Sequence, residues 1–425
     1  MIAKDFVYDR REHSAAFTSD YVFHQLIPYI GNKRKLLSLI DKAIVATGAE
    51  KGTFVDFFAG SSVVSRFAKK RGFRVVANDW EPYSKFICHS YIQCNRMPSF
   101  ASFDGVDSLL HELNSIEPLE GYVTTHLCPK DDDHPDIKHE RMFFTHTNGM
   151  KIDAIRERLQ RLHDEERLSP DEFAVVIAAM MYSVSYVSNT SGVFKGFHRG
   201  WGGNTGTALY RILSEFELKA PVMYDNGQDN CSTRLDAQLL AEQMKTSQER
   251  IEIAYLDPPY NQHPYGSNYH VLNTVALWDK PDMTPQIEGR NKSAIRLDWR
   301  TERRSSYNHH SLALNAYQKL IDTIPARFIL TSYSTDGNIP LQGMIDIASK
   351  RGRVSAVTNA YKRYRVSSQR FSNKPMNVEF ILIVDTAGIS TSNSAEALYN
   401  EILQKEEVAN ATHREIALDQ QMTLF

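Results

Sequence analysis

The stretch "TFVDFFAGSSVVSRFAKKRGFRVVANDW", at residues 53–80, restricts the fold more than any other part of the chain. An apolar run of strand length ends in glycine, a segment with helical spacing follows, and after a second glycine another apolar run ends in an acid. A strand, a glycine turn, a helix and a second strand in this order are typical of doubly wound α/β folds. The sequence therefore predicts a Rossmann-like sheet.

Later apolar runs extend this sheet. "IEIAYLDPPY" at 251–260 and "RFILTSYS" at 327–334 have the length and composition of strands, and so does "PVMYDN" at 221–226. The runs "RVSAVTNAYKRY" and "NVEFILIVD", at 353–364 and 377–385, are separated by a basic connection and predict a β-hairpin. We therefore expect an α/β fold in which a doubly wound sheet carries a C-terminal hairpin.

Helical patterns interrupt the strands in the middle of the chain. Helical spacing is found at about 150–167 and 170–188, and Ser169 with Glu172 has the spacing of a capping box at the start of the second helix. A Gly-rich loop with aromatic and basic residues follows.

A chain of 425 residues is too long for one ordinary core. The patterns predict a main α/β domain, a mainly helical insertion, and a polar helix with a tail. The expected boundaries are 1–95 together with 222–390 for the first, 96–221 for the second and 391–425 for the third.

The first glycine turn has the residues of a nucleoside site. In "DFFAGSS", Asp56, Phe58 and Gly60 follow a strand, where glycine lets a ligand approach the backbone and the next helix offers free N–H groups. Asp79 ends the next strand, 19 residues after Gly60, at a spacing that suits a carboxylate binding ribose hydroxyls. The turn lacks a P-loop lysine and a second glycine, so it fits S-adenosylmethionine better than a pyrophosphate. A plain tight turn is the alternative.

The motif "LDPPY", at residues 256–260, is a second candidate site at the end of a strand. Its prolines fix the backbone and remove two N–H donors, so that the Asp257 carboxylate and the Pro258 carbonyl form a rigid pair of acceptors. Such a pair can grip both N–H bonds of an exocyclic amine and make its nitrogen more nucleophilic. Tyr260 would lie against the face of a base flipped out of a duplex. A proline-rich turn beside an unrelated Asp is the alternative.

Composition restricts the class of protein and the compartment in which the chain is expected. No apolar run reaches the roughly 18 residues that span a membrane, and the N-terminal segment has no apolar core of a signal peptide. The four cysteines lack CxxC spacing, which fits a reducing cytoplasm, and together with scattered histidines they predict no metal site.

Basic residues gather in two segments of a chain whose net charge is only −2. Residues 347–378 hold eight Lys or Arg and no acid, and residues 290–304 hold six basic residues against two acidic ones. Such segments suit the phosphates of a nucleic acid, although solvated surface is the alternative for each of them.

These motifs, in this order, resemble the Dam-like class of DNA adenine-N6 methyltransferases, and within it the type II restriction-modification subset. "DFFAGSS" resembles the cofactor motif of the class, with Ser62 in place of its second glycine, and "DPPYNQHPYGSNYHVLNTVALWD" is similar to its catalytic segment. "PYIGNKRKLL" at 28–37 and "NGQDN" at 226–230 are similar to further cofactor segments. The resemblance makes the α/β domain the catalytic domain and the helical insertion the target-recognition part.

The resemblance implies S-adenosylmethionine as the cofactor. Tyr29, Asn32 and Lys33 would lie near its methionine end, Asp79 at its ribose and Asp229 at its adenine amine. The expected cofactor-binding residues are Tyr29, Asn32, Lys33, Asp56, Phe58, Gly60, Asp79, Asp229 and Asp257. The expected catalytic residues are Asp257, Pro258 and Tyr260.

Double-stranded DNA is the partner that the resemblance implies. The expected DNA contacts are Lys195, Arg199, Trp201, Arg303, Arg304, Lys362, Arg363, Arg365 and Arg370. A cognate restriction endonuclease is left open as a second partner, and a monomer is expected. The C-terminal "QMTLF" resembles the motif with which bacterial proteins dock on the sliding clamp, through Gln421, Leu424 and Phe425, and the frayed end of a helix is the alternative.

Two other functions remain open from the residues alone. The same acceptor pair could serve cytosine-N4 in DNA or an amine in RNA. The chain could also be a DNA-binding subunit without catalysis, against which the intact Gly60, Asp79, Asp257 and Tyr260 argue.

Overall fold

A computed structural model describes residues 20–289, 292–293, 296–362 and 376–422 of the chain. The chain forms two compact units. The first comprises Met1–Leu37, Ala59–Arg234 and Tyr265–Arg303, and the second comprises Ser38–Phe58, Leu235–Pro264 and Arg304–Phe425. The units are interleaved in the sequence, and the predicted domain boundaries stay a prediction.

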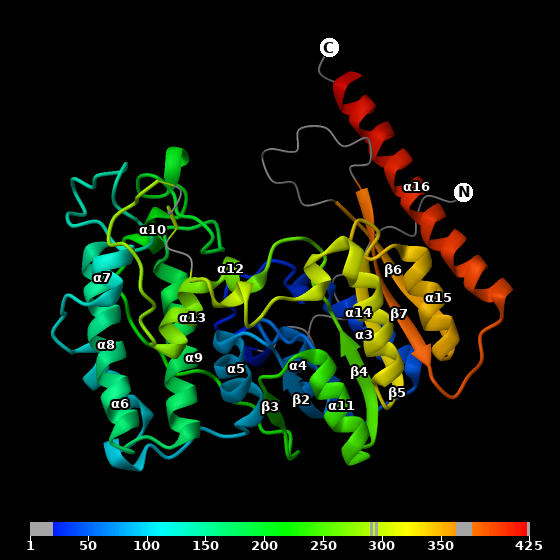
Figure 1. Cartoon of the computed structure of the whole chain (residues 1–425), viewed down its shortest axis with the longest axis horizontal. Coiled ribbons are helices and arrows are strands. Elements are labelled where there is room, and N and C mark those ends of the chain that lie inside the picture. Colours follow the sequence, from blue (N-terminus) through cyan, green and yellow to red (C-terminus); the bar gives the residue numbers. More distant parts are fainter. Residues whose placement is uncertain (1–19, 290–291, 294–295, 363–375, 423–425) are drawn as a thin grey trace. The chain divides into compact units, whose positions relative to one another are not determined.

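A sheet with the strand order β1-β4-β5-β7-β6 forms the core of the second unit. β1 (Thr53–Asp56), β4 (Ile251–Leu256) and β5 (Ala326–Ser334) run parallel, while β7 (Met376–Asp385) lies antiparallel between β5 and β6 (Arg353–Lys362). The strands from β4 to β6 can be followed in Figure 1. The predicted α/β class is confirmed, and so is the C-terminal hairpin, because β6 and β7 pair along their full length.

The three parallel strands are buried almost throughout, as strands covered on both faces by helices are. Helices α11, α14, α15 and α16 pack in series, and α16 also packs on β6 and β7. The predicted polar C-terminal helix is thus confirmed as α16. The helices of the second unit are α3 (Leu37–Thr47), α11 (Ala237–Ser247), α14 (His310–Thr323), α15 (Leu341–Arg351) and α16 (Ser392–Met422), together with the short η6 (Ser306–Asn308).

The first unit contains the parallel pair β2 (Arg74–Asn78) and β3 (Cys231–Thr233). The strand predicted at 221–226 is wrong, because that segment is irregular and β3 starts later. Asn226 explains the difference. Its side-chain amide donates to the carbonyls of Lys69, at 3.2 Å, and Phe73, at 2.8 Å, so the segment is held by a side chain instead of a strand ladder.

Two long helices, α8 (His146–Asp164) and α9 (Pro170–Val187), confirm the predicted helical pair of the first unit. Ser169 caps α9, and the Glu172 side chain accepts from the Ser169 N–H at 2.9 Å, which completes the predicted capping box. The remaining elements of this unit are α2 (Asp20–Phe23), η1 (Lys33–Leu36), α4 (Val63–Lys70), α5 (Pro82–Cys88), η2 (His89–Gln93), η3 (Ala101–Phe103), α6 (Val106–Asn114), α7 (Tyr122–Leu127), η4 (Gly203–Thr205), α10 (Leu209–Ile212), α12 (Tyr265–Asn268), α13 (His270–Leu277) and η5 (Asp298–Arg300).

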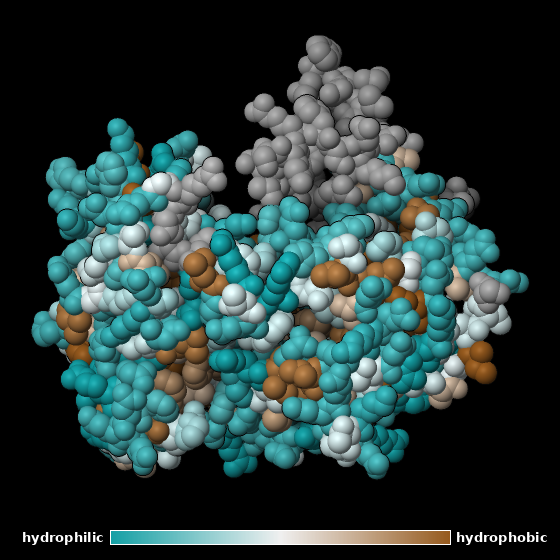
Figure 2. All heavy atoms as spheres, in the orientation of Figure 1, coloured by the Kyte–Doolittle hydropathy of each residue, from teal (hydrophilic) through white to brown (hydrophobic). Residues whose placement is uncertain are grey.

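The described surface is mainly hydrophilic on the face drawn in Figure 2, with hydrophobic residues in small separate groups. Among the described residues, no helix combines the length and the apolar character needed to cross a bilayer. All four cysteines are free thiols.

Candidate active site

In the first unit, the Asp79 carboxylate, which follows β2, is hydrogen-bonded to the turn that contains Gly60. The Gly60 N–H donates to Asp79 Oδ2 at 2.7 Å, and the Glu81 N–H donates to Asp79 Oδ1 at 2.9 Å. Burial raises the pKa of the Asp79 carboxyl, and the N–H groups of Glu81 and Gly60 oppose that rise. Hydrogen bonds from the Ser84 side chain and the Trp80 backbone also oppose the rise. The carboxylate is therefore fixed in direction at the turn.

Gly60 is required at this turn for two reasons. Its φ is +51°, and a Cβ at this position would lie 2.7 Å from Cε1 of Tyr29. The Tyr29 ring cannot give way easily, because it stacks on Tyr269 at 4.9 Å and on Tyr265 at 5.2 Å between ring centroids. Its hydroxyl lies 3.1 Å from the hydroxyl of Tyr83.

We call Tyr29, Tyr83, Tyr265 and Tyr269 the tyrosine cluster. The Tyr269 hydroxyl accepts from the Ile30 N–H at 2.7 Å, so the cluster also fixes the backbone beside Tyr29. Tyr265 and Tyr269 belong to the segment after "DPPY" and were not predicted as site residues. Their spacing of four residues, which places two rings on one helical face, was the sequence pattern from which they could have been predicted.

Asn32 and Lys33 begin the short helix η1. The Asn32 side chain caps it by accepting from the Arg34 N–H at 2.8 Å. Lys33 is buried, and its ammonium donates to the Gly31 carbonyl at 3.1 Å. Asp229 is exposed, and its backbone carbonyl accepts from Arg74 Nε at 2.9 Å.

A buried acid, Glu81, follows Asp79 and was not predicted from the sequence. Asn273 donates to Glu81 Oε2 at 2.6 Å, and Arg303 Nε lies 3.5 Å from the same oxygen. Burial raises the pKa of Glu81 to about 7, although Arg303 and Asn273 act in the opposite direction. Arg303 is itself buried and also pairs with Asp298 at 2.7 Å. The DNA contact predicted for Arg303 is therefore corrected: its charge is used inside the first unit.

The second unit contains the other predicted cofactor and catalytic residues, at the ends of two neighbouring parallel strands. Asp56 ends β1 opposite Tyr255, and Asp257 comes directly after β4, two residues beyond Tyr255. Asp56 is buried, and one of its oxygens accepts from the Phe58 N–H at 3.3 Å. The Phe58 ring meets the edge of Tyr307 at 5.6 Å between centroids. The pairing register thus brings Asp56 and the "DPPY" motif to one edge of this sheet.

The "DPPY" motif is fixed by its neighbours in the second unit. The Tyr260 ring lies 4.5 Å from the Tyr333 ring, and its hydroxyl is 3.5 Å from Ser332 Oγ on β5. The Tyr260 carbonyl accepts from the Asn338 N–H at 2.9 Å. Burial and the charge of Asp257 raise the pKa of Tyr260, so its phenol stays protonated.

A cavity of about 450 Å³ adjoins this motif. Two of its lining residues hold the motif and the residue after it, because Asn338 donates to the Tyr260 carbonyl and Asn308 donates to the Asn261 carbonyl at 2.7 Å. The volume lies in the range of small-molecule sites. The cavity is lined by Gln262, Asn308, His309, His310, Ser311 and Asn338.

The predicted DNA contacts occupy different environments. Lys195 and Arg199 are exposed in the Gly-rich loop of the first unit. Trp201 is half-buried, and its indole N–H donates to the Asp132 carbonyl at 2.9 Å, which anchors the ring to the protein. Arg304 is exposed in the second unit, and its Nε donates to His309 Nε2 at 3.3 Å.

Several predicted residues lie outside the described part of the chain. Lys362 ends β6 and Gln421 lies in α16, but only their backbones are described. The remaining ones are Arg363, Arg365, Arg370, Leu424 and Phe425.

Comparison with known proteins adds an independent line of evidence. The sequence pattern of the family described as D12 class N6 adenine-specific DNA methyltransferase matches residues 29–334. Modification methylase LlaI of Lactococcus lactis subsp. lactis is 28% identical over 377 residues, which cover 86% of this chain and 56% of that protein. Type II methyltransferase M.NlaIII of Neisseria lactamica is 28% identical over 357 residues, covering 83% of this chain and 96% of that protein.

Type II methyltransferase M.FokI of Planomicrobium okeanokoites is 29% identical over 351 residues, which cover 81% of this chain and 50% of that protein. The chain therefore spans about half the length of the LlaI and FokI enzymes and nearly all of the NlaIII enzyme.

Proposed function

The chain belongs to the family of D12 class N6 adenine-specific DNA methyltransferases, and we propose that it transfers a methyl group from S-adenosylmethionine to the exocyclic amine of a flipped adenine in duplex DNA. The observation that carries this proposal is the "DPPY" motif at the carboxyl end of β4, held rigidly by β5 and by Asn338.

The acceptors of the motif act on the amine. Two consecutive prolines leave the backbone of the motif without N–H groups at those positions, so that the Pro258 carbonyl and the Asp257 carboxylate both face a ligand as acceptors. When both amine hydrogens are gripped, the lone pair on the nitrogen is less delocalised into the base and more nucleophilic. This effect is preorganised electrostatics, which needs no strong base.

Tyr260 provides the surface for the base. Its ring packs against the tilted ring of Tyr333, and its backbone is held by Asn338, so the ring cannot turn aside when a base arrives. Stacking on a fixed aromatic ring offsets part of the unstacking cost of a flipped base.

The first unit supplies residues that fit the methyl donor. S-adenosylmethionine provides the electrophilic methyl group when it is bound. The fixed Asp79 carboxylate suits two ribose hydroxyls, and the Tyr29 ring lines the turn at Gly60, in the place that a Cβ would need. We assign Tyr29, Asn32, Lys33 and Asp229 to the same ligand.

The biological setting is a further part of the proposal. Relatives named as modification methylases support a role in restriction-modification, and we include a cognate restriction endonuclease in the proposal as a partner. Free thiols support a cytoplasmic location. We retain a monomer as the functional form, DNA contacts through Lys195, Arg199 and Arg304, and a clamp contact through the C-terminal "QMTLF".

The test is transfer of a labelled methyl group to duplex DNA, followed by mass analysis of the nucleosides. The expected product of the wild type is N6-methyladenine, and Asp257→Ala abolishes it. Asp322→Ala, an exposed acid on α14, is the matched control and retains full activity. N4-methylcytosine as the product, labelling of RNA only, or equal activity of Asp257→Ala would each refute the proposal.

A further inference from the structure

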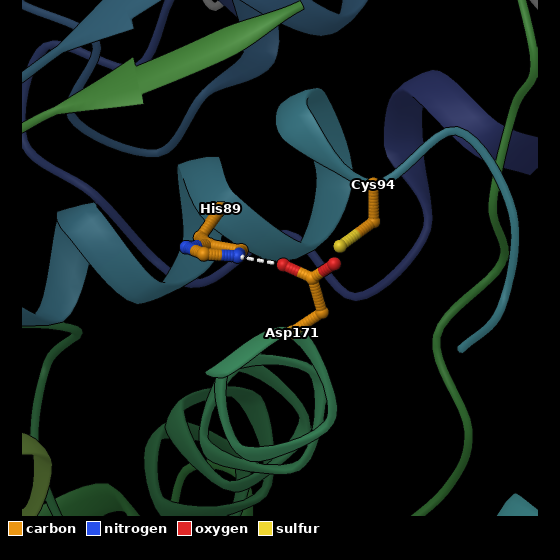
Figure 3. A group of neighbouring side chains, drawn as sticks. All are labelled: His89, Cys94 and Asp171. Carbon is orange, nitrogen blue, oxygen red and sulfur yellow. Dashed lines mark hydrogen bonds and ion pairs between the residues drawn. The ribbon is translucent and has the colours of Figure 1, made fainter. Parts of the chain in front are cut away.

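Three side chains that the proposed function does not use converge in the first unit. His89 begins one short helical segment, Cys94 follows its last residue, and Asp171 lies in the first turn of α9. Figure 3 shows the three side chains pointing toward one another, and one donor atom of each lies within 4.8 Å of the other two. His89 Nε2 and Asp171 Oδ1 are 2.6 Å apart.

This helical segment, His89–Gln93, is a π-helix. At its end the Cys94 N–H donates to the His89 carbonyl at 3.0 Å. In an α-helix, residues five apart point in different directions, at about 140° around the axis. The wider π-turn brings them to one side. π-turns are rare and are found frequently at functional sites. Here the turn has the specific effect of aligning an imidazole with a thiol.

We propose that His89, Cys94 and Asp171 bind a divalent cation of the Zn²⁺ class. The donors are an imidazole nitrogen, a sulfur and a carboxylate oxygen, all of which are zinc ligands, with bonds of about 2.0–2.3 Å. Binding requires His89 Nε2 and Asp171 Oδ1, now 2.6 Å apart, to separate so that the cation fits between them. The Asp171 side chain is 55% exposed while that of His89 is 12% exposed, so solvent can supply a fourth ligand from one side only.

Binding exchanges a proton for the cation. Lys69 Nζ donates to the Cys94 carbonyl at 3.1 Å, which places a positive charge beside Cys94. On binding, the S–H bond breaks, its proton passes to solvent, and a sulfur–metal bond forms. The remaining imidazole proton moves to Nδ1, which leaves the Nε2 lone pair for the cation.

The site would be structural. It joins the segment after α5 to the start of α9, two parts of the first unit that are more than 75 residues apart in the sequence. Without the cation, the packing of η2 on α9 and the hydrogen bond from His89 to the exposed Asp171 carboxylate make this connection. The cation would therefore raise the stability of the unit without taking part in methyl transfer.

The test is titration of the full, untagged chain with Co²⁺, which reports thiolate ligation by a charge-transfer absorption in the near ultraviolet. We expect one Co²⁺ per chain with this absorption, displaced by Zn²⁺. Cys94→Ser should remove the absorption, whereas Cys231→Ser, which changes another free thiol, should retain it. Far-ultraviolet circular dichroism verifies that each variant is folded.

An exposed ligand gives a second variant that spares the core. Asp171→Asn should weaken Co²⁺ binding at least about tenfold, because the amide loses the charge of the carboxylate, and Zn²⁺ should raise the thermal midpoint of the wild type more than that of this variant. A folded wild type without the thiolate absorption would overturn the proposal. Unchanged absorption in Cys94→Ser, or unchanged affinity in Asp171→Asn, would do the same.

Discussion

At the scale of single residues, the first unit depends on a missing side chain at Gly60 and on two buried acids whose pKa values are raised. Gly60 leaves the place of its Cβ to the Tyr29 ring. Glu81 is an acid with a pKa raised by burial to about 7, beside an Asp79 whose pKa is also raised. Both residues fix the backbone and the electrostatics around the proposed cofactor site.

Gly60→Ala should destabilise the protein by about 1–3 kcal/mol and weaken S-adenosylmethionine binding, because the new Cβ has a positive φ and meets the Tyr29 ring. Urea unfolding and calorimetry measure the two effects. Gly72→Ala is the matched control: its φ is +91°, but nothing lies within 4 Å of the added atom. It should lose some stability and bind the cofactor normally. Equal cofactor affinity in both variants would contradict the role given to the contact with Tyr29.

Glu81 should make stability depend on pH. Its pKa in the folded protein is about 7, above the ordinary 4.5, so the folded state holds the proton more tightly than the unfolded chain. The resulting stabilisation is fully present below about pH 4.5 and is lost as pH rises through 7, by at most about 3 kcal/mol.

Urea unfolding of the wild type and of Glu81→Gln between pH 4.5 and 8 measures this effect. The free energy of unfolding of the wild type should fall relative to that of the variant as pH rises, since all other titrating groups are common to both. A difference that stays constant over this range would show that the two states have the same Glu81 pKa.

At the scale of elements, a helix or strand could be predicted from the sequence where the interactions that form it are local. The start of α9 was predictable because Ser169, Pro170 and Glu172 are a complete local signal. The strand expected at 221–226 was wrong because the amide of Asn226 bonds to carbonyls more than 150 residues away in the sequence. The π-turn at His89–Gln93 has no sequence signature, since its register depends on tertiary packing.

Ser169→Ala should destabilise the protein by about 1 kcal/mol, because the N–H of Glu172 loses its acceptor and the capping box is broken. Urea unfolding at neutral pH gives the value. Ser169→Asp keeps a capping oxygen and should stay within a few tenths of a kcal/mol of the wild type. If Ser169→Ala unfolds at the same urea concentration as the wild type, the cap contributes nothing to stability.

At the scale of the whole molecule, the sequence predicted the order of most strands along the chain, but it predicted few of the contacts between distant segments. The parallel strands and the hairpin followed from apolar runs and glycine turns. The tyrosine cluster joins residues near 29, 83 and 265–269, and Glu81 pairs with Arg303. Such pairings over some 200 residues leave no periodic pattern, and a single sequence cannot reveal them.

The wide separation of paired strands in the second unit has a consequence for biosynthesis. β1 ends at Asp56 and its partner β4 begins at Ile251, so at about 5–20 residues per second β1 is synthesised roughly 10–40 s before β4. β6 likewise precedes β7, the strand that links it to β5. During translation, β1 therefore waits as an apolar strand without its β4 partner, and slow codons between the two would prolong the period in which the nascent chain is prone to aggregate.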